Sequence, residues 1–129
     1  MKIVLDTNVF VSALRSNAGA SRRLLRLIFE GKISCAISTT LWMEYEDHTS
    51  LEQRETLLNA FASHCVWTSM YFNWRPNLRD EGDNFLIELA IASGSTAIVT
   101  HNLKDLKSGE LLFPHFAILT PDMFLERFK

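Results

Sequence analysis

The stretch that decides the fold is Ile3-Val4-Leu5-Asp6-Thr7-Asn8-Val9-Phe10, IVLDTNVF. Its apolar, β-branched beginning predicts a short buried strand at residues 2–5. The strand stops at the carboxylate of Asp6, and the apolar pattern resumes after Thr7 and Asn8 as a helix over 8–14. Because burying a carboxylate is costly unless it is paired or binds a metal, Asp6 is a candidate functional residue.

The chain has 129 residues, of which 47% are hydrophobic, so it can bury a core, and we expect one domain over residues 1–129. No apolar run reaches the roughly 18 residues that a membrane span requires. Asp6 also interrupts the apolar region that a signal peptide would need, so we expect no membrane association and a cytoplasmic location. Cys35 and Cys65 lack a metal-binding spacing and are expected to be buried thiols of a reducing compartment.

Strand-like and helix-like segments alternate beyond this opening. They are a helix at 21–30, a strand at 33–37, helices at 39–48 and 51–64, a strand at 66–72, a loop at 73–82, a helix at 83–93, strands at 96–100 and 116–120, and a helix at 121–128. This alternation predicts a three-layer α/β/α sandwich with a central, mainly parallel five-stranded sheet. In such folds the functional crevice lies at the carboxyl ends of the strands.

Several of these helix boundaries carry residues that favour helix ends. Ser21 and Ser38 are predicted N-caps, Ser50 and Gln53 form a predicted capping box, Gly31 is a predicted stop, and Pro121 opens the final helix. These signals place the boundaries independently of the apolar pattern.

Three further acids fall near the predicted carboxyl edge of the sheet. Glu44 lies among bulky apolar residues in the helix after the second strand, and Asp105 follows the fourth strand. Asp83 begins the helix before that strand and shares its inward-facing side. Each acid also has an ordinary interpretation: Glu44 as a surface charge, Asp105 as a turn residue, and Asp83 as an acid favoured by the helix dipole.

The acids are more informative together than singly. Carboxylates gathered at one edge repel each other unless a cation neutralises them. Oxygen ligands without paired His or Cys suit Mg²⁺ or Mn²⁺, which can activate water and stabilise charge on a phosphate. The net charge of −2 argues against a simple nucleic-acid-binding module, yet with these acids in one site the rest of the chain would be net positive.

Four segments carry a family resemblance: MKIVLDTNVFVSAL, ISTTLWMEYED, DNFLIELAIASGSTAIVTHNLKDL and the ending ILTPDMFLERF. Together they resemble PIN-domain ribonucleases, including the toxin components of VapC-like toxin–antitoxin pairs. The resemblance implies a PIN-like fold and metal-dependent hydrolysis of single-stranded RNA. It also implies that Mg²⁺ or Mn²⁺ is held by the matching acids, which are Asp6, Glu44, Asp83 and Asp105.

Other residues have roles only through this resemblance. Thr7, Asn8 and Thr100 would support the acids by hydrogen bonding. Asn102 stands where many relatives carry Asp, so we favour Asp105 in the acidic role and Asn102 as a neutral helper. Competing positions remain: Glu46 beside Glu44, and Asp80 and Glu81 beside Asp83.

Partners also follow from the resemblance, namely an RNA substrate, a cognate antitoxin and a second copy in a homodimer. Arg22, Arg23 and Arg26 could contact RNA phosphates or an acidic antitoxin segment, or could form a solvated helix face. His101 could touch phosphate or be an exposed loop residue. The alternative function is a catalytically weak or inactive PIN fold that binds RNA or protein.

Overall fold

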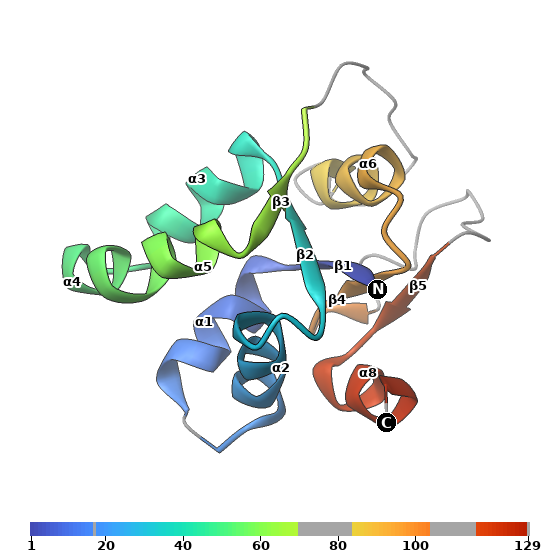
Figure 1. Ribbon diagram of the computed structural model, residues 1–129, viewed down its shortest axis with the longest axis horizontal. Coiled ribbons are helices and arrows are strands. Elements are labelled where there is room, and N and C mark those ends of the chain that lie inside the picture. Colours follow the sequence, from blue (N-terminus) through green and yellow to red (C-terminus); the bar gives the residue numbers. More distant parts are fainter. Residues whose placement is uncertain (17, 70–83, 104–115, 129) are drawn as a thin grey trace.

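Parallel strands form a five-stranded sheet in the order β3-β2-β1-β4-β5 in the computed structural model (Figure 1). The structure describes residues 1–16, 18–69, 84–103 and 116–128. The strands are β1 (Lys2–Leu5), β2 (Ser34–Ile37), β3 (Cys65–Trp67), β4 (Ala97–Val99) and β5 (Ala117–Leu119). The predicted fold class is therefore confirmed.

The strand register aligns the carboxyl ends of the sheet. Leu5 lies opposite Val99 in β4, and Ile37 of β2 lies opposite Trp67 of β3. A hydroxyl or carboxylate residue directly follows each strand, and we call these five residues the polar rim: Asp6, Ser38, Thr68, Thr100 and Thr120. The rim is where a parallel sheet of this type places its functional crevice.

Helices cover both faces of the sheet. They are α1 (Thr7–Arg15), α2 (Ala20–Phe29), α3 (Thr39–Asp47), α4 (Leu51–Gln53), α5 (Asn59–Ser63), α6 (Asn84–Ser93) and α8 (Pro121–Phe128). Figure 1 shows α6 on one side of the sheet and α1, α2 and α5 on the other. α6 contacts the central strands β1, β2 and β4, as a crossover from β3 to β4 requires.

An aromatic cluster fills the core between α1, α3 and α5. The ring of Phe10 stacks on Tyr45 with centroids 4.7 Å apart and lies 5.0 Å from the ring of Phe61. All three side chains are buried. Because Phe10 lies one helical turn after Asp6, this cluster fixes the helix that begins at the candidate acid.

Most of the predicted helix ends are present. The Oγ atom of Ser38 accepts a hydrogen bond from the backbone of Leu41 at 3.2 Å. Ser50 and Gln53 form the reciprocal capping box. Gly31 adopts φ 78°, the left-handed conformation that ends α2 at low steric cost.

Three local predictions were wrong. Ser21 is not an N-cap, because α2 begins at Ala20 after Gly19, and the Ser21 side chain is buried 3.4 Å from a ring nitrogen of His101. The helix expected over 51–64 is interrupted by a π-helical stretch at Arg54–Leu58. The strand predicted over 66–72 begins one residue earlier and β3 ends at Trp67, although the amide of Thr68 still donates to the Ile37 carbonyl at 2.8 Å; residues 70–72 lie outside the described residues.

Candidate active site

Asp6 occupies the junction between β1 and α1. Its backbone carbonyl accepts from the amide of Val9 at 3.0 Å and so begins the helix, while its side chain makes no capping bond. The carboxylate Oδ2 instead accepts from Thr100 Oγ1 at 2.7 Å and from Asn8 Nδ2 at 3.3 Å. The parallel pairing of β1 with β4 brings Thr100 to this position across 94 residues of sequence.

The segment after β4 extends this network. The Oγ1 atom of Thr100 accepts from the backbone amide of Asn102 at 3.0 Å, and the amide of His101 donates to Asn8 Oδ1 at 3.2 Å. Asn8 and Thr100, predicted to support Asp6, therefore hydrogen-bond to it directly. Together these contacts hold the turn after β1 against the turn after β4.

Burial governs the ionisation of Asp6. The side chain is only 9% exposed, and this desolvation raises its pKa above the ordinary value of 3.8. Hydrogen bonds from Thr100, from the backbone of Thr7 and from Asn8 oppose the rise, as does the charge of His101. A carboxylate that is costly to charge in this position would be stabilised by a nearby cation.

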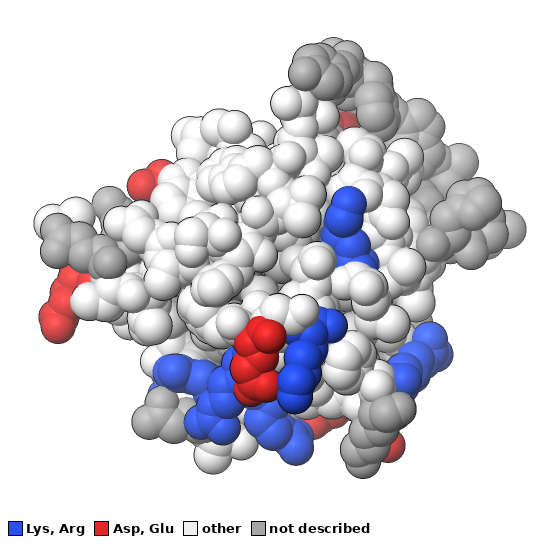
Figure 2. All heavy atoms as spheres, viewed as in Figure 1, with Lys and Arg blue, Asp and Glu red and all other residues white. Residues whose placement is uncertain are grey.

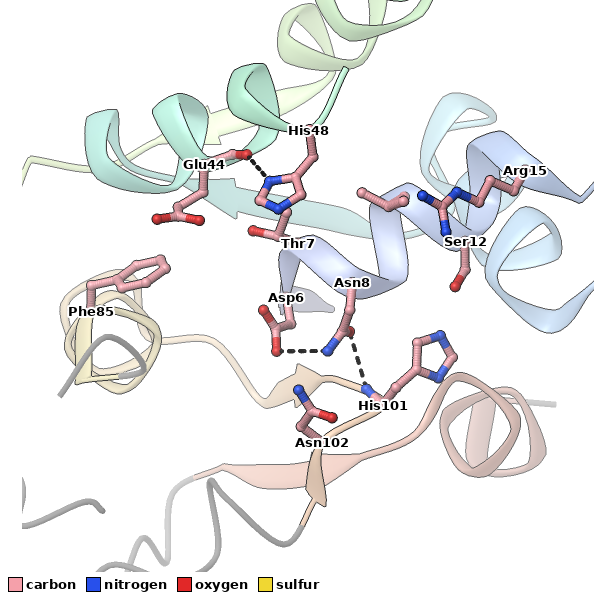
Figure 3. A pocket seen from close by; sticks show the side chains of 11 residues that line it. Asp6, Thr7, Asn8, Ser12, Arg15, Glu44, His48, Phe85, His101 and Asn102 are labelled. Carbon is pink, nitrogen blue, oxygen red and sulfur yellow. Dashed lines mark hydrogen bonds between the residues drawn. The ribbon is translucent and has the colours of Figure 1, made fainter. Parts of the chain in front are cut away.

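Asp6 opens onto a pocket of about 580 Å³ that Glu44 also lines (Figure 3). Figure 3 shows the two carboxylates reaching this pocket from the end of β1 and from α3, with Phe85 of α6 beside them. Its lining residues are Asp6, Thr7, Asn8, Val11, Ser12, Arg15, Glu44, His48, Phe85, His101 and Asn102. Glu46 is not among them, so of these two acids only Glu44 lines the same pocket as Asp6.

Residues 2–104 match the PIN domain family. The chain belongs to the PIN domain family. It is 33% identical to the uncharacterised protein MJ1680 of Methanocaldococcus jannaschii over 146 aligned positions, which cover all of this chain and 92% of that protein. The resemblance predicted from the sequence motifs is therefore confirmed.

A solved structure shares the fold of this PIN domain. It is a chain of VapBC2 from Rickettsia felis, determined bound to a DNA fragment from the promoter of that pair. The TM-score is 0.60 with 18% identity, and the match covers 92% of this chain and 97% of that one. The fold likeness therefore covers most of this chain.

Some acids predicted for the PIN site lie outside the described residues. These are Asp83 and Asp105, together with the competing Asp80 and Glu81. Within the described ranges, no three His, Cys, Asp or Glu side chains gather closely enough to hold a metal. The pocket does offer the carboxylates of Asp6 and Glu44 and the amide of Asn102, which are oxygen donors of the kind that Mg²⁺ and Mn²⁺ accept.

Sequence reasoning missed five pocket residues of the PIN domain: Val11, Ser12, Arg15, His48 and Phe85. Helical spacing could have found four of them, since Val11, Ser12 and Arg15 follow Asn8 by three, four and seven residues. His48 follows Glu44 by four, and its Nδ1 lies 2.9 Å from the Glu44 carbonyl oxygen. No sequence signal marks Phe85.

The three arginines of α2 do not form one surface. The Nε atom of half-buried Arg22 donates to the carbonyl of Ala13 at 2.6 Å and so ties α2 to α1. Arg23 and Arg26 are exposed and line a separate pocket of about 330 Å³ between α2 and α8. Figure 2 shows basic side chains gathered over α1 and α2 on this face.

Tyr45 connects β1 and α3, the two elements that carry Asp6 and Glu44 of the candidate site. It follows Glu44 in α3, is fully buried, and its hydroxyl donates to the carbonyl of Leu5 at 2.6 Å, directly before Asp6. Tyr45→Phe should lower the free energy of unfolding by about 1–3 kcal/mol, because it leaves a buried carbonyl without this donor. Urea denaturation measures the change.

Thr96→Val is the matched control for this prediction. It removes an exposed hydroxyl that donates to the carbonyl of Lys2 at 3.2 Å, and should change stability by less than about 0.5 kcal/mol. Equal losses in the two variants would show that the Tyr45 bond does not stabilise the site.

Among the described helices, none combines the length and apolar character needed to cross a membrane.

Proposed function

We propose that this PIN domain is a Mg²⁺- or Mn²⁺-dependent endoribonuclease. The observation that carries the proposal is that Asp6 and Glu44, 38 positions apart in the sequence, line one pocket at the carboxyl edge of the sheet. The burial of Asp6 also supports the proposal, because a carboxylate with little access to water is stabilised when it binds a cation. Since β5 belongs to the same sheet as β1, residues 1–129 are proposed as one domain.

Asp6 and Glu44 of the pocket would hold the ion, together with Asp83 and Asp105 from outside the described residues. Asn102 would be a neutral helper. When bound, a divalent ion lowers the pKa of water and offsets charge on a phosphate. Thr100 and Asn8 fix the orientation of the Asp6 carboxylate through their hydrogen bonds.

Arg15 of α1 brings a cationic group to the pocket (Figure 3). His101, in the turn after β4, lines the same pocket. A guanidinium donates well to phosphate oxygens, so Arg15 would hold the RNA backbone while the acids remain free for the ion. This arrangement gives one pocket both of the charges that phosphodiester hydrolysis needs.

The test compares Glu44→Gln with Glu46→Gln in a cleavage assay on single-stranded RNA with Mn²⁺. Glu44→Gln should lower the rate at least tenfold, since even groups that only orient metal ligands alter affinity or activity by about 10–100-fold. Glu46→Gln, on the same helix but outside the pocket, should cleave like the wild type. Equal rates for the two variants would remove Glu44 from the site, and RNA binding without any cleavage would favour a non-catalytic PIN module.

We further propose that the protein acts in the cytoplasm as the toxin of a toxin–antitoxin pair, with an antitoxin as partner and pairing with a second copy. The structural likeness to a chain of a VapBC complex supports the antitoxin. Arg23 and Arg26, beside apolar Leu125 and Phe128, offer a surface for an acidic segment. The two cysteines are unbonded, as a reducing compartment would leave them.

A further inference from the structure

A second pocket lies on the same edge of the sheet as the acidic pocket. It measures about 350 Å³ and is lined by Ser38, Thr39, Thr40, Trp67, Thr68 and Ser69. Two of these, Ser38 and Thr68, belong to the polar rim that also contains Asp6. The pocket therefore lies where β2 and β3 end, beside the end of β1.

Trp67 gives this pocket an open aromatic surface. It is the last residue of β3, an edge strand, and its side chain is 51% exposed. On its covered side the indole lies against Trp42 of α3, with ring centroids 5.6 Å apart. A large aromatic ring that is supported by another ring and half open to solvent is suited to stack on a planar ligand.

The remaining lining selects the kind of ligand. The other five residues all carry hydroxyls, and none of the lining residues carries a charge. Hydroxyls both donate and accept hydrogen bonds, so they can meet the mixed edge of a nucleobase. A phosphate would instead require cationic groups, which occur in the acidic pocket as Arg15.

Two spacings place this pocket close to Asp6 and Glu44, one along α3 and one across the sheet. Thr40 precedes Glu44 by four residues on α3, so their side chains share a helix face about 6 Å apart. β3 lies two strand positions from β1, or about 9.6 Å across the sheet. A single-stranded chain with one phosphate beside Asp6 would reach Trp67 within the length of a dinucleotide.

We infer that the Trp67 pocket is a base-binding subsite, which takes a nucleobase of single-stranded RNA adjacent to the cleaved bond. This inference rests on the proposed ribonuclease function. It assigns to Trp67 the stacking contact and to the hydroxyls of Thr39, Thr40 and Thr68 the contacts with the base edge. Binding of a base in this subsite determines which phosphodiester bond of the substrate lies beside Asp6 and Glu44.

Binding of short fluorescent single-stranded RNA, followed by anisotropy in EDTA, tests the subsite without cleavage. Trp67→Ala should weaken binding roughly 5-fold to 150-fold, the range for one base stacked on an aromatic ring. Trp67→Phe keeps a stacking ring and should stay within about threefold of the wild type. Met43→Ala is the control: it removes an exposed apolar side chain of α3 that lines neither pocket, and the variant should bind like the wild type.

An abasic scan of the RNA identifies the contact itself. Removing the base at one position should weaken binding to the wild type, and Trp67→Ala should be insensitive to that same removal. Unchanged binding by Trp67→Ala, with Mn²⁺-dependent cleavage retained, would overturn the subsite alone. Absence of both RNA binding and cleavage in the wild type would overturn the proposed function and the subsite together.

Light scattering separates the subsite from a contact between two copies. Trp67→Ala, checked for folding by circular dichroism, should keep the oligomeric state of the wild type. Dissociation of an oligomer in Trp67→Ala would assign the exposed edge of β3 to a protein interface and overturn the subsite.

Discussion

Asp6→Asn should reduce Mn²⁺-dependent RNA cleavage more than a hundredfold, because it removes the carboxylate around which the pocket is organised. The amide can still accept from Thr100, so the local geometry is preserved while the negative charge is lost. A loss beyond the roughly 10–100-fold typical of supporting residues would mark Asp6 as a direct ligand. Cleavage of a single-stranded RNA with and without EDTA measures this effect.

Although it lowers activity, Asp6→Asn should raise the stability of the metal-free protein. Burial raises the pKa of Asp6 above 3.8, so folding opposes its ionisation at neutral pH. The resulting penalty is absent below pH 3.8 and grows as pH rises towards the folded-state pKa. Metal-free Asp6→Asn should therefore melt at a higher temperature than the wild type at pH 7, and this advantage should vanish towards pH 4.

Adding Mn²⁺ should reverse the order of the two melting temperatures, so that the wild type becomes more stable than Asp6→Asn. A ligand present at 100 times its Kd stabilises the folded state by about 2.7 kcal/mol, a gain that only the wild type would show. Asp47→Asn, an exposed acid at the end of α3, is the control and should resemble the wild type in both assays. Cleavage by Asp6→Asn at the wild-type rate, or cleavage that survives EDTA, would contradict the proposed site.

Expression in a bacterial host extends this comparison to the proposed toxin role. The wild type should arrest growth and Asp6→Asn should relieve the arrest. Unaffected growth in the presence of active enzyme would remove the toxin role and leave the ribonuclease standing.

Phe10→Ala should lower the free energy of unfolding by about 3–5 kcal/mol, a large share of the 5–15 kcal/mol typical of a domain. The ring is 1% exposed and contacts the rings of both Tyr45 and Phe61, so its removal leaves a cavity where α1, α3 and α5 meet. Urea denaturation monitored by circular dichroism measures the loss.

Phe128→Ala provides the comparison for this core variant. Phe128 is a half-buried ring at the end of α8 that stacks on Phe124 at 5.9 Å. Its removal should cost clearly less than the removal of Phe10, since solvent already reaches part of the ring. A larger loss for Phe128→Ala would mean that the aromatic cluster is not the main support of α1.

Local sequence patterns sufficed for the sheet and for most helix ends. Ser38 and the Ser50–Gln53 pair are cap residues whose partners lie within three positions, so the pattern alone contains the bond. Ser21 also follows this pattern, but α2 begins one residue earlier and the side chain instead meets His101, 80 positions away. A cap signal cannot reveal that a distant side chain competes for the same residue.

The candidate site was predicted unevenly for a related reason. Asp6 was evident because a charge at the end of an apolar strand conflicts with its surroundings. Its neighbours Arg15 and His48 lie on helix faces whose direction depends on how α1 and α3 pack. Similarly, the choice between Glu44 and Glu46 required the rotation of α3 about its axis, which the mixed sequence of that helix does not define.

The hydrogen bond from Thr100 to Asp6 also has a consequence for the order of events during synthesis. It joins residues 94 positions apart, and β4 is the strand that completes the pairing of β1 on that side. A growing chain that has released only β1, β2 and β3 already holds Asp6 and Glu44, but its Asp6 carboxylate has the Asn8 amide as a partner and still lacks the shorter hydrogen bond from Thr100. Because chains emerge from the ribosome N-terminus first, the pocket is completed only after β4 and Thr100 have left the ribosome.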